Sequence, residues 1–202
     1  MYNPPGFREE RTEVLHTAIR SVGLAILVTT GPDGLMASHI PMLLDTDAGP
    51  LGTLIGHVAR GNPQARATGP ALAIFQGLDA YITPSWYPSK QVDQKVVPTW
   101  NYVAVHATGT LETFEDPPRL LDIVTRLTER FEGARGKPWA VSDAPADYVA
   151  GMLKGITGLV LPIVNLEGKW KMSQNRTPAD SAGVVGGLRA DGRDDVAALI
   201  AR

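Results

Sequence analysis

The feature that most constrains the fold of this chain is a series of short apolar runs separated by turn-forming residues. Leu24–Thr30 is followed by Gly31–Gly34, which has the composition of a hairpin turn, and then by Leu35–Leu44. Further runs follow with few helical segments between them: Leu51–Val58, Ala71–Gln76, Asp79–Thr83, Tyr102–Phe114 and Gly155–Trp170. Closely spaced strands of this kind favour an antiparallel barrel or sandwich and do not fit alternating βαβ units.

Helical spacing of apolar residues is confined to a few segments. Arg8–Val22 and Arg119–Phe131 show it clearly, and Asp143–Leu153 shows it more weakly. The tail from Asp180 predicts one or two short helices, and we expect the glycine-rich segment Gly183–Gly187 to form a loop between them. The expected fold class is mainly β (α+β), antiparallel, with peripheral helices.

The length and composition of the chain set the class of protein. Its 202 residues suffice for one substantial domain, and a hydrophobic content of 44% is ordinary for a protein with a packed core. We expect a single domain over residues 1–202 with a helical tail over about residues 178–202. A net charge of −2 offers no clustered basic face for nucleic acid, and the absence of cysteine from the sequence excludes disulfides, thiolate catalysis and Cys-ligated zinc.

No segment of the sequence has the character of a membrane anchor or a secretion signal. No apolar run approaches the ~20 residues that a membrane helix needs. Met1–Phe7 contains prolines where a signal peptide would have an apolar core. We therefore expect a cytoplasmic protein with no membrane partner.

The densest mixture of aromatic rings and polar groups lies between Tyr81 and Tyr102. This stretch holds two of the four tryptophans and three of the five tyrosines, together with hydroxyls, an amide and lysines, and its prolines prevent a continuous helix. Such a mixture suits a pocket that stacks on a flat polar ligand. It equally suits an ordered loop whose tyrosine and tryptophan polar atoms bond to the protein's own backbone. The stretch alone does not decide between the two.

A phosphate site is predicted just beyond the run Leu51–Val58. Arg60 can form a bidentate pair with a phosphate, and His57 adds a second donor three residues earlier. Asn62 followed by Pro63 predicts the start of a short helix, whose free backbone N–H groups favour an anion. The alternative is that Arg60 caps this helix or pairs with a neighbouring side chain.

A second concentration of polar groups lies at Lys169–Arg176. Gln174 and Asn175 supply donors and acceptors that suit the edge of a heterocycle. Lys171 and Arg176 suit a phosphate or a carboxylate. The alternative is a basic strand end that contacts DNA phosphates, for which so few charges are a small footprint.

Metal binding and nucleophilic catalysis have no signature in the sequence. The four histidines are scattered, with no pair at ligand spacing, so we predict no metal site. His39 and His57 are better interpreted as sheet histidines or cofactor contacts. Ser85 is not framed as Gly-x-Ser-x-Gly, and Gly183–Gly187 lacks the preceding strand of a dinucleotide-binding turn, so we predict no catalytic residue.

Taken together, several segments resemble the PaiB family of FMN-binding negative transcriptional regulators. The segments that carry the resemblance are Met1–Phe7, His57–Pro63 (His-Val-Ala-Arg-Gly-Asn-Pro), Ser85–Lys90 (Ser-Trp-Tyr-Pro-Ser-Lys), Val97–Tyr102 (Val-Pro-Thr-Trp-Asn-Tyr) and Lys169–Asn175 (Lys-Trp-Lys-Met-Ser-Gln-Asn). They cover nearly the whole chain in the family's order, and their combination is specific. The family's common Ser-Pro-Ser-Trp-Tyr reads Thr83–Tyr87 here, which keeps a hydroxyl at the first position.

The resemblance implies an FMN-binding split β-barrel, related to the pyridoxamine-phosphate oxidases, that forms a homodimer with FMN at the subunit interface. It also implies that basic and hydroxyl side chains on barrel strands hold the phosphate, a role that His57 and Arg60 fit. The residues whose positions match cofactor-binding roles are His39, His57, Arg60, Asn62, Ser85, Trp86, Tyr87, Lys90, Thr99, Trp100, Asn101, Lys171 and Gln174.

Three functions remain open at this point. The first is a negative transcriptional regulator of the PaiB type, for which the family implies DNA binding, although the sequence shows no helix-turn-helix and no basic patch. The second is an FMN-dependent oxidoreductase, such as a flavin reductase or an oxidase of a small molecule, in which the cofactor supplies the chemistry. The third is a flavin- or haem-binding module without turnover.

Overall fold

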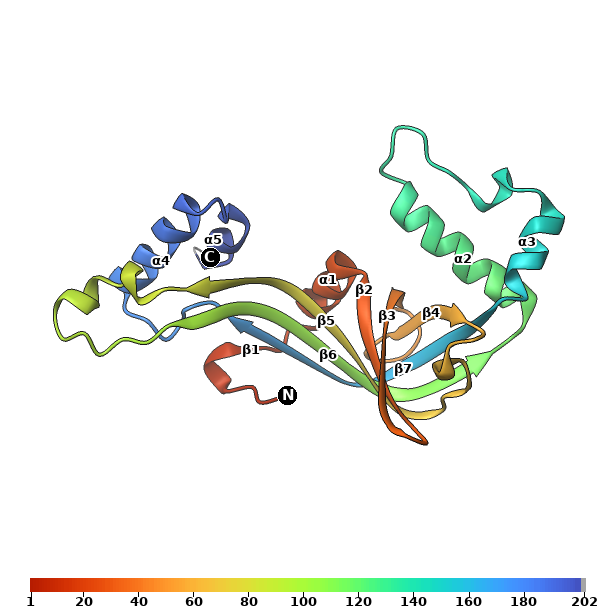
Figure 1. Ribbon diagram of the computed structural model, residues 1–202, viewed down its shortest axis with the longest axis horizontal. Helices are drawn as coiled ribbons and strands as arrows, with labels where there is room; N and C mark the ends of the chain where they lie inside the picture. Colours follow the sequence, from red (N-terminus) through yellow and green to blue (C-terminus); the bar gives the residue numbers. More distant parts are fainter. Residues whose placement is uncertain (201–202) are drawn as a thin grey trace. The chain divides into compact units, whose positions relative to one another are not determined.

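A seven-stranded sheet runs through the computed structural model, which describes residues 1–200 (Figure 1). In the order of the sheet, its strands are β1 (Arg8–Glu9), β7 (Ile156–Lys171), β4 (Thr53–Ala59), β3 (Gly34–Asp45), β2 (Leu24–Gly31), β5 (Gly69–Ile82) and β6 (Thr99–Phe114). A further pairing between β7 and β6 closes every strand except β1 into a barrel. The pairs β1–β7, β2–β3, β2–β5, β3–β4 and β4–β7 are antiparallel. The split β-barrel expected from the sequence is confirmed.

The helices lie outside the sheet, as expected. The α-helices are α1 (Thr12–Val22), α2 (Pro117–Glu132), α3 (Ala146–Leu153), α4 (Pro178–Ala190) and α5 (Asp194–Ile200), and short 3-10 turns occupy Pro5–Phe7, Pro63–Arg66, Pro84–Trp86, Pro88–Gln91 and Val141–Asp143. Within residues 1–200, no helix is long and apolar enough to cross a membrane.

The chain divides into two compact units, and β5, β6 and β7 each contribute to both. Unit 1 comprises Met1–Arg11, Gln76–Val105 and the segment from Glu167 onward. Unit 2 comprises Thr12–Phe75 and His106–Leu166, and therefore holds β2, β3 and β4.

In unit 2, helix α2 covers one row of side chains that runs across three strands. Ile55 of β4 lies opposite Leu43 of β3 and opposite Val160 of β7. Ile123 and Leu127, one helical turn apart on α2, pack on this row. The helix begins at Pro117, two residues before the predicted segment Arg119–Phe131, because the Asp116 carboxylate caps it by accepting a hydrogen bond from the backbone N–H of Arg119, at 3.0 Å.

In unit 1, helices α4 and α5 cover the ends of β5 and β6 (Figure 1). The shared core contains Ile82 and Val103 from the strands, and Val184 and Leu188 from α4. The N-terminal segment is held on β7, where Asn3 donates to the Gly168 carbonyl and the amino group of Met1 lies 2.7 Å from a carboxylate oxygen of Glu167.

Three local predictions were wrong. Gly183–Gly187 lies inside α4, not in a loop, because the lack of side chains at Gly183 and Gly187 lets the Trp86 segment pack directly on the helix. Strand β5 passes through Gly77 without a break, where the sequence predicted two separate runs. Helix α1 begins at Thr12 and not at Arg8, because Arg8 and Glu9 pair with β7 as strand β1.

Candidate cofactor site

Three of the sequence-predicted residues line one pocket in unit 2. The pocket has a volume of about 320 Å³, and His39, His57 and Asn62 lie in its wall. The rest of the wall comes from β3, β4 and the start of β7: Ser38, Ile40, Pro41, Val58, Ala59 and Ile156. Residues far apart in the sequence therefore converge where β4 ends.

Asn62 fixes the backbone at this strand end. Its side-chain oxygen accepts from the backbone N–H of Gln64 at 2.9 Å, which confirms the predicted cap, and its amide donates to Ser38 Oγ at 2.9 Å. The buried Gln64 in turn donates to the carbonyl of Leu27 and to Thr29 Oγ1, each at 3.0 Å. Ser38 and Gln64 were missed by the sequence analysis, since their partners depend on strand register.

His57 presents an unsatisfied ring nitrogen. Its Nδ1 atom is buried and has no hydrogen-bond partner within residues 1–200. Burial lowers the pKa of His57 below its usual value, so the ring is neutral at pH 7. A buried polar atom without a partner costs free energy, and a ligand that supplies a hydroxyl or a phosphate oxygen would remove that cost.

Arg60 follows at the end of β4 but does not line the pocket wall. Its backbone N–H donates to the Gly155 carbonyl at 2.8 Å, which ties the strand end to the start of β7. Its guanidinium is about half exposed and lies 3.3 Å from a carboxylate oxygen of Glu115. Exposed ion pairs of this kind contribute roughly 0–1 kcal/mol, so a phosphate could displace Glu115 at little cost.

In unit 1, the predicted polar residues mostly bond to their own chain. Lys171 Nζ donates to Thr99 Oγ1 at 2.5 Å and to the Trp100 carbonyl at 2.6 Å. Burial, together with the nearby charges of Lys169 and Arg176, lowers the pKa of Lys171.

Two predicted amides of unit 1 are similarly engaged. The Asn101 amide is fully buried and donates to Ser173 Oγ at 3.0 Å. The Gln174 side chain accepts from the backbone N–H of Met172 at 2.6 Å and donates to the Trp170 carbonyl.

The segment Ser85–Lys90 packs against α4. The Trp86 ring lies on Gly187, and Tyr87 is 2% exposed with the guanidinium of Arg176 4.5 Å from its ring centre. Burial raises the pKa of Tyr87, an effect that the charge of Arg176 partly opposes. Ser85 and Lys90 belong to the two 3-10 turns of this segment.

Trp100 differs from these packed residues. It is 54% exposed and meets Tyr81, itself 50% exposed, edge to face at 5.9 Å between ring centres. Among the predicted rings of unit 1, Trp100 is therefore the one that offers a broad open face for stacking.

The comparison with known families decides the assignment. The family described as "Putative FMN-binding domain" matches residues 1–165. The chain is 31% identical to "Protease synthase and sporulation protein PAI 2" of Bacillus subtilis, an alignment that covers 92% of this chain and 87% of that protein. The chain belongs to the PaiB family. An uncharacterized protein from Emericella nidulans is 34% identical, over 96% of this chain and 92% of its own length.

The PaiB fold also occurs in a solved structure of low sequence identity. The FAD and haem binding protein from Mycobacterium smegmatis superimposes with a TM-score of 0.57 at 20% identity, covering 81% of this chain and 73% of the other. The likeness shows the shared fold. The match to the family, described as a putative FMN-binding domain, is what supports a flavin as the cofactor.

Proposed function

We propose that this chain binds FMN and that the pocket at the end of β4 receives the phosphate end of the cofactor. The observation that carries the proposal is the buried, unpartnered Nδ1 of His57 beside Asn62 and Ser38. Arg60, the residue directly after β4, supplies the positive charge that a phosphate requires. Bound FMN would supply hydride and electron transfer, and the protein would hold and orient it.

Within unit 1, taken by itself, the predicted residues are proposed to form a surface that stacks on a flat heterocycle. Trp100 has the open ring face that stacking needs, and Lys171 presents a cation beside it. Tyr87 and Asn101 are already packed within unit 1, so their proposed part is to support this surface and not to stack on the ring.

The cofactor proposal is tested on the purified protein. We expect a yellow protein that releases FMN, and not FAD, on acid treatment, with one FMN per chain. A colourless protein that takes up neither added FMN nor FAD would refute the proposal. Release of FAD alone would keep the flavin but remove FMN.

A homodimer is proposed as the working form. Several large apolar side chains of the unit 2 barrel lie on the surface, among them Leu35 at 79%, Val164 at 71% and Leu24 at 50% exposure. Large exposed apolar residues on a barrel are typical of interaction surfaces. Sedimentation should give twice the chain mass, and Val164→Asp should shift the protein toward monomer; a wild-type monomer at micromolar concentration would contradict the dimer.

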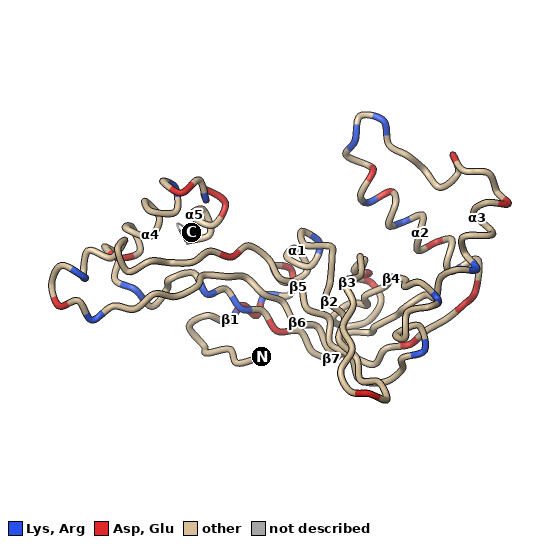
Figure 2. Tube along the Cα trace, in the orientation of Figure 1, with Lys and Arg blue, Asp and Glu red and all other residues tan. Residues whose placement is uncertain are grey.

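A role as a negative transcriptional regulator, in the cytoplasm, is proposed from the PaiB assignment. Basic and acidic positions are interspersed along the chain (Figure 2), so any DNA contact would involve few phosphates. A shift of promoter DNA that weakens with salt is the expected result. No shift at low salt, combined with steady NADH or NADPH oxidation by the FMN-loaded protein, would favour the oxidoreductase instead.

A further inference from the structure

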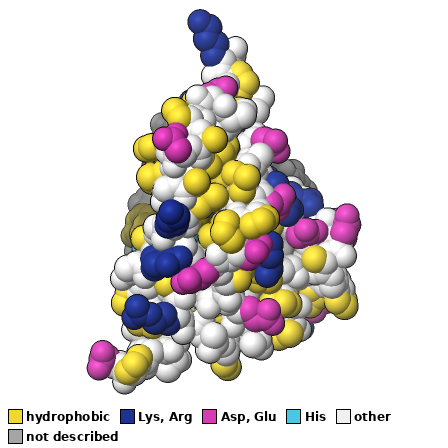
Figure 3. Space-filling view, turned by 90° about the vertical axis from the view of Figure 1, so that its right-hand side faces the viewer, with side chains coloured by type: hydrophobic (Ala, Val, Ile, Leu, Met, Phe, Trp, Pro, Cys, Tyr) yellow, Lys and Arg dark blue, Asp and Glu magenta, His cyan; other side chains and the backbone are white. Residues whose placement is uncertain are grey.

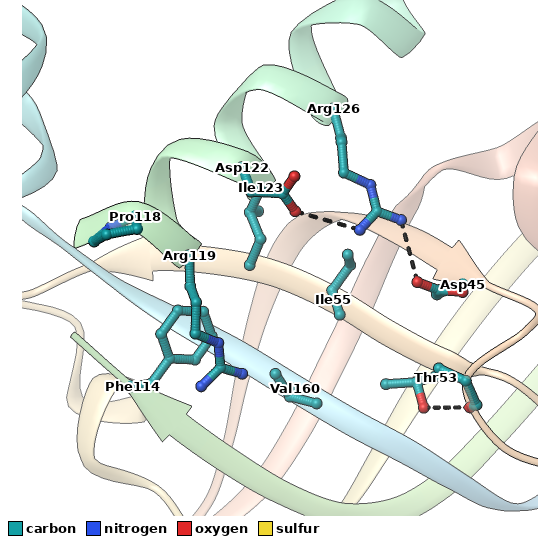
Figure 4. Close-up of a pocket in the computed structure, with 11 residues that line it drawn as sticks. Asp45, Thr53, Ile55, Phe114, Pro118, Arg119, Asp122, Ile123, Arg126 and Val160 are labelled. Carbon is teal, nitrogen blue, oxygen red and sulfur yellow. Dashed lines mark hydrogen bonds and ion pairs between the residues drawn. The ribbon is translucent and has the colours of Figure 1, made fainter. Parts of the chain in front are cut away.

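A second pocket in unit 2 is lined by none of the residues proposed to hold FMN. It lies between α2 and the strands, with a volume of about 480 Å³ (Figure 4). Its floor is apolar and consists of Ile55, Phe114 and Val160 from the strands and Ile123 from the helix. The volume falls within the roughly 300–1,000 Å³ typical of small-molecule sites.

Arg119 stands beside this floor with its donors unused. The guanidinium carbon lies 3.9 Å from the centre of the Phe114 ring, and Figure 4 shows the group beside Phe114 and Val160. Within residues 1–200 its guanidinium makes no hydrogen bond or ion pair. Arg119 also lies in the first turn of α2, where the helix dipole disfavours a cation, so helix stability does not explain its presence.

The other polar groups of the pocket satisfy one another. Arg126 lies 3.4 Å from a carboxylate oxygen of Asp45 and 3.4 Å from one of Asp122. Thr53 Oγ1 donates to the Ala48 carbonyl at 2.7 Å. Arg119 is thus the one cation of the pocket wall, among the described residues, without a carboxylate partner.

We infer that this pocket binds a small carboxylate with a flat apolar body. The guanidinium matches a carboxylate in a two-bond arrangement, and the apolar floor accepts a ring or a short chain. A fully hydrophilic anion such as phosphate would leave the floor exposed to water. Arg126 neutralises much of the repulsion that Asp45 and Asp122 would exert on the ligand.

The test uses cinnamate, its neutral analogue cinnamamide, and inorganic phosphate, with binding to the full chain measured by NMR titration. Cinnamate should bind, and the amide and phosphate should each bind at least about tenfold more weakly. Arg119→Gln should raise the dissociation constant for cinnamate about tenfold, the loss expected for one charge-assisted contact.

Arg130→Gln is the matched control. Arg130 lies on the same helix and is stacked on a phenylalanine, 5.6 Å from the Phe131 ring centre, but does not line the pocket. The Arg130→Gln substitution should leave the affinity for cinnamate unchanged. Thermal unfolding should confirm that both variants are folded. The FMN content is assayed separately, so a failure of the FMN proposal would not change the result for cinnamate.

Four results would overturn the inference. If cinnamamide bound as tightly as cinnamate, the pocket would be an apolar cleft that does not recognise the carboxylate. If phosphate bound as tightly as cinnamate, Arg119 would be an unselective anion contact. Unchanged cinnamate affinity in Arg119→Gln would remove the guanidinium from the site. If that variant instead lowered the oligomeric mass, the pocket would belong to contact with a second copy of the chain.

Discussion

At the scale of single residues, Arg60 is the residue for which the sequence left two roles open. The alternatives were a phosphate contact or a local ion pair, and the structure contains the ion pair, with Glu115 at 3.3 Å. The two are compatible, since an exposed pair of this type is weak and exchangeable.

Replacing Arg60 tests the phosphate contact. Arg60→Ala should weaken FMN binding by about 1.5–3 kcal/mol, the value of a hydrogen bond to a charged group. The measurement is quenching of flavin fluorescence on titration. Arg66→Ala, an exposed arginine in the adjacent 3-10 turn, serves as the control and should have little effect. Equal affinities for wild type and Arg60→Ala would remove Arg60 from the site.

Replacing the partner should act in the opposite direction. Glu115→Gln releases Arg60 from its ion pair, so FMN should bind more tightly, by up to about 1 kcal/mol. The same fluorescence titration detects the change. In a protein that already carries Arg60→Ala, Glu115→Gln should leave FMN affinity unchanged. If Glu115→Gln still increased FMN affinity in that protein, Glu115 would act on FMN binding independently of Arg60.

The lowered pKa of His57 predicts a pH-dependent stability. The folded protein binds the proton less readily than the unfolded chain, whose histidine titrates near pH 6.5. The contribution of His57 is therefore fully present above about pH 6.5 and is lost as the pH falls through the folded-state pKa. Without FMN, His57→Gln should lose less stability than wild type between pH 7.5 and pH 5.5.

Unfolding temperatures provide the readout, with about 2–4 °C expected for each kcal/mol in a chain of this size. A profile of His57→Gln that coincides with wild type would assign the acid sensitivity to other groups.

At the scale of elements, the most informative error concerns helix α4. Glycine is a poor helix former, so three glycines within five residues predicted a loop. The structure keeps the helix because a Cβ at Gly183 would lie 2.0 Å from the Trp86 carbonyl oxygen, and one at Gly187 would lie 2.2 Å from the Trp86 ring. A tertiary contact of this kind cannot be read from local propensity.

The same helix contains its own control for this explanation. Gly183→Ala should destabilise the protein by about 1–3 kcal/mol, because the backbone of Trp86 must shift. Gly186→Ala, with nothing within 4 Å of its added carbon, should stabilise by about 0.5–1 kcal/mol through helix propensity. Urea unfolding separates the two. Opposite signs are required, and two stabilising substitutions would contradict the packing argument.

The strands were predictable and their partners were not. Alternating and continuous apolar runs located all the barrel strands, since that pattern depends on local sequence. The contact of Asn62 with Ser38, and those of Gln64 with β2, depend on how distant strands align, which no local pattern encodes. The residues at the end of β4 were therefore predictable from the sequence, whereas the residues that strand register brings to them were not.

At the scale of the whole molecule, the family match and the two units do not coincide. The match ends at residue 165, whereas unit 1 includes the end of β7 and helices α4 and α5.

The region of α2 and α3 carries exposed apolar side chains. Figure 3 shows hydrophobic side chains gathered on this side of the molecule, and the large ones that are about half exposed are Phe131, Trp139, Tyr148 and Met152. Such a surface suits contact with another protein chain.

Cofactor binding should stabilise the protein by an amount that rises with the logarithm of the FMN concentration. FMN at a hundredfold excess over its dissociation constant should add about 2.7 kcal/mol to the free energy of unfolding, provided that the unfolded chain does not bind it. Hydrogen exchange should locate the first protection at β3, β4 and the 3-10 turn after Asn62. Protection confined to α4 and α5 would contradict the pocket assignment.

Closure of the barrel between β6 and β7 also governs when the fold can be completed during synthesis. Strand β4 ends at Ala59 and pairs with a strand that begins at Ile156, so nearly half of the chain separates the two partners. Contacts between such distant segments form slowly, because the loop entropy must be lost before they stabilise anything. On the ribosome, β4 and β6 must wait for β7, and until then they expose edges that another strand could pair with.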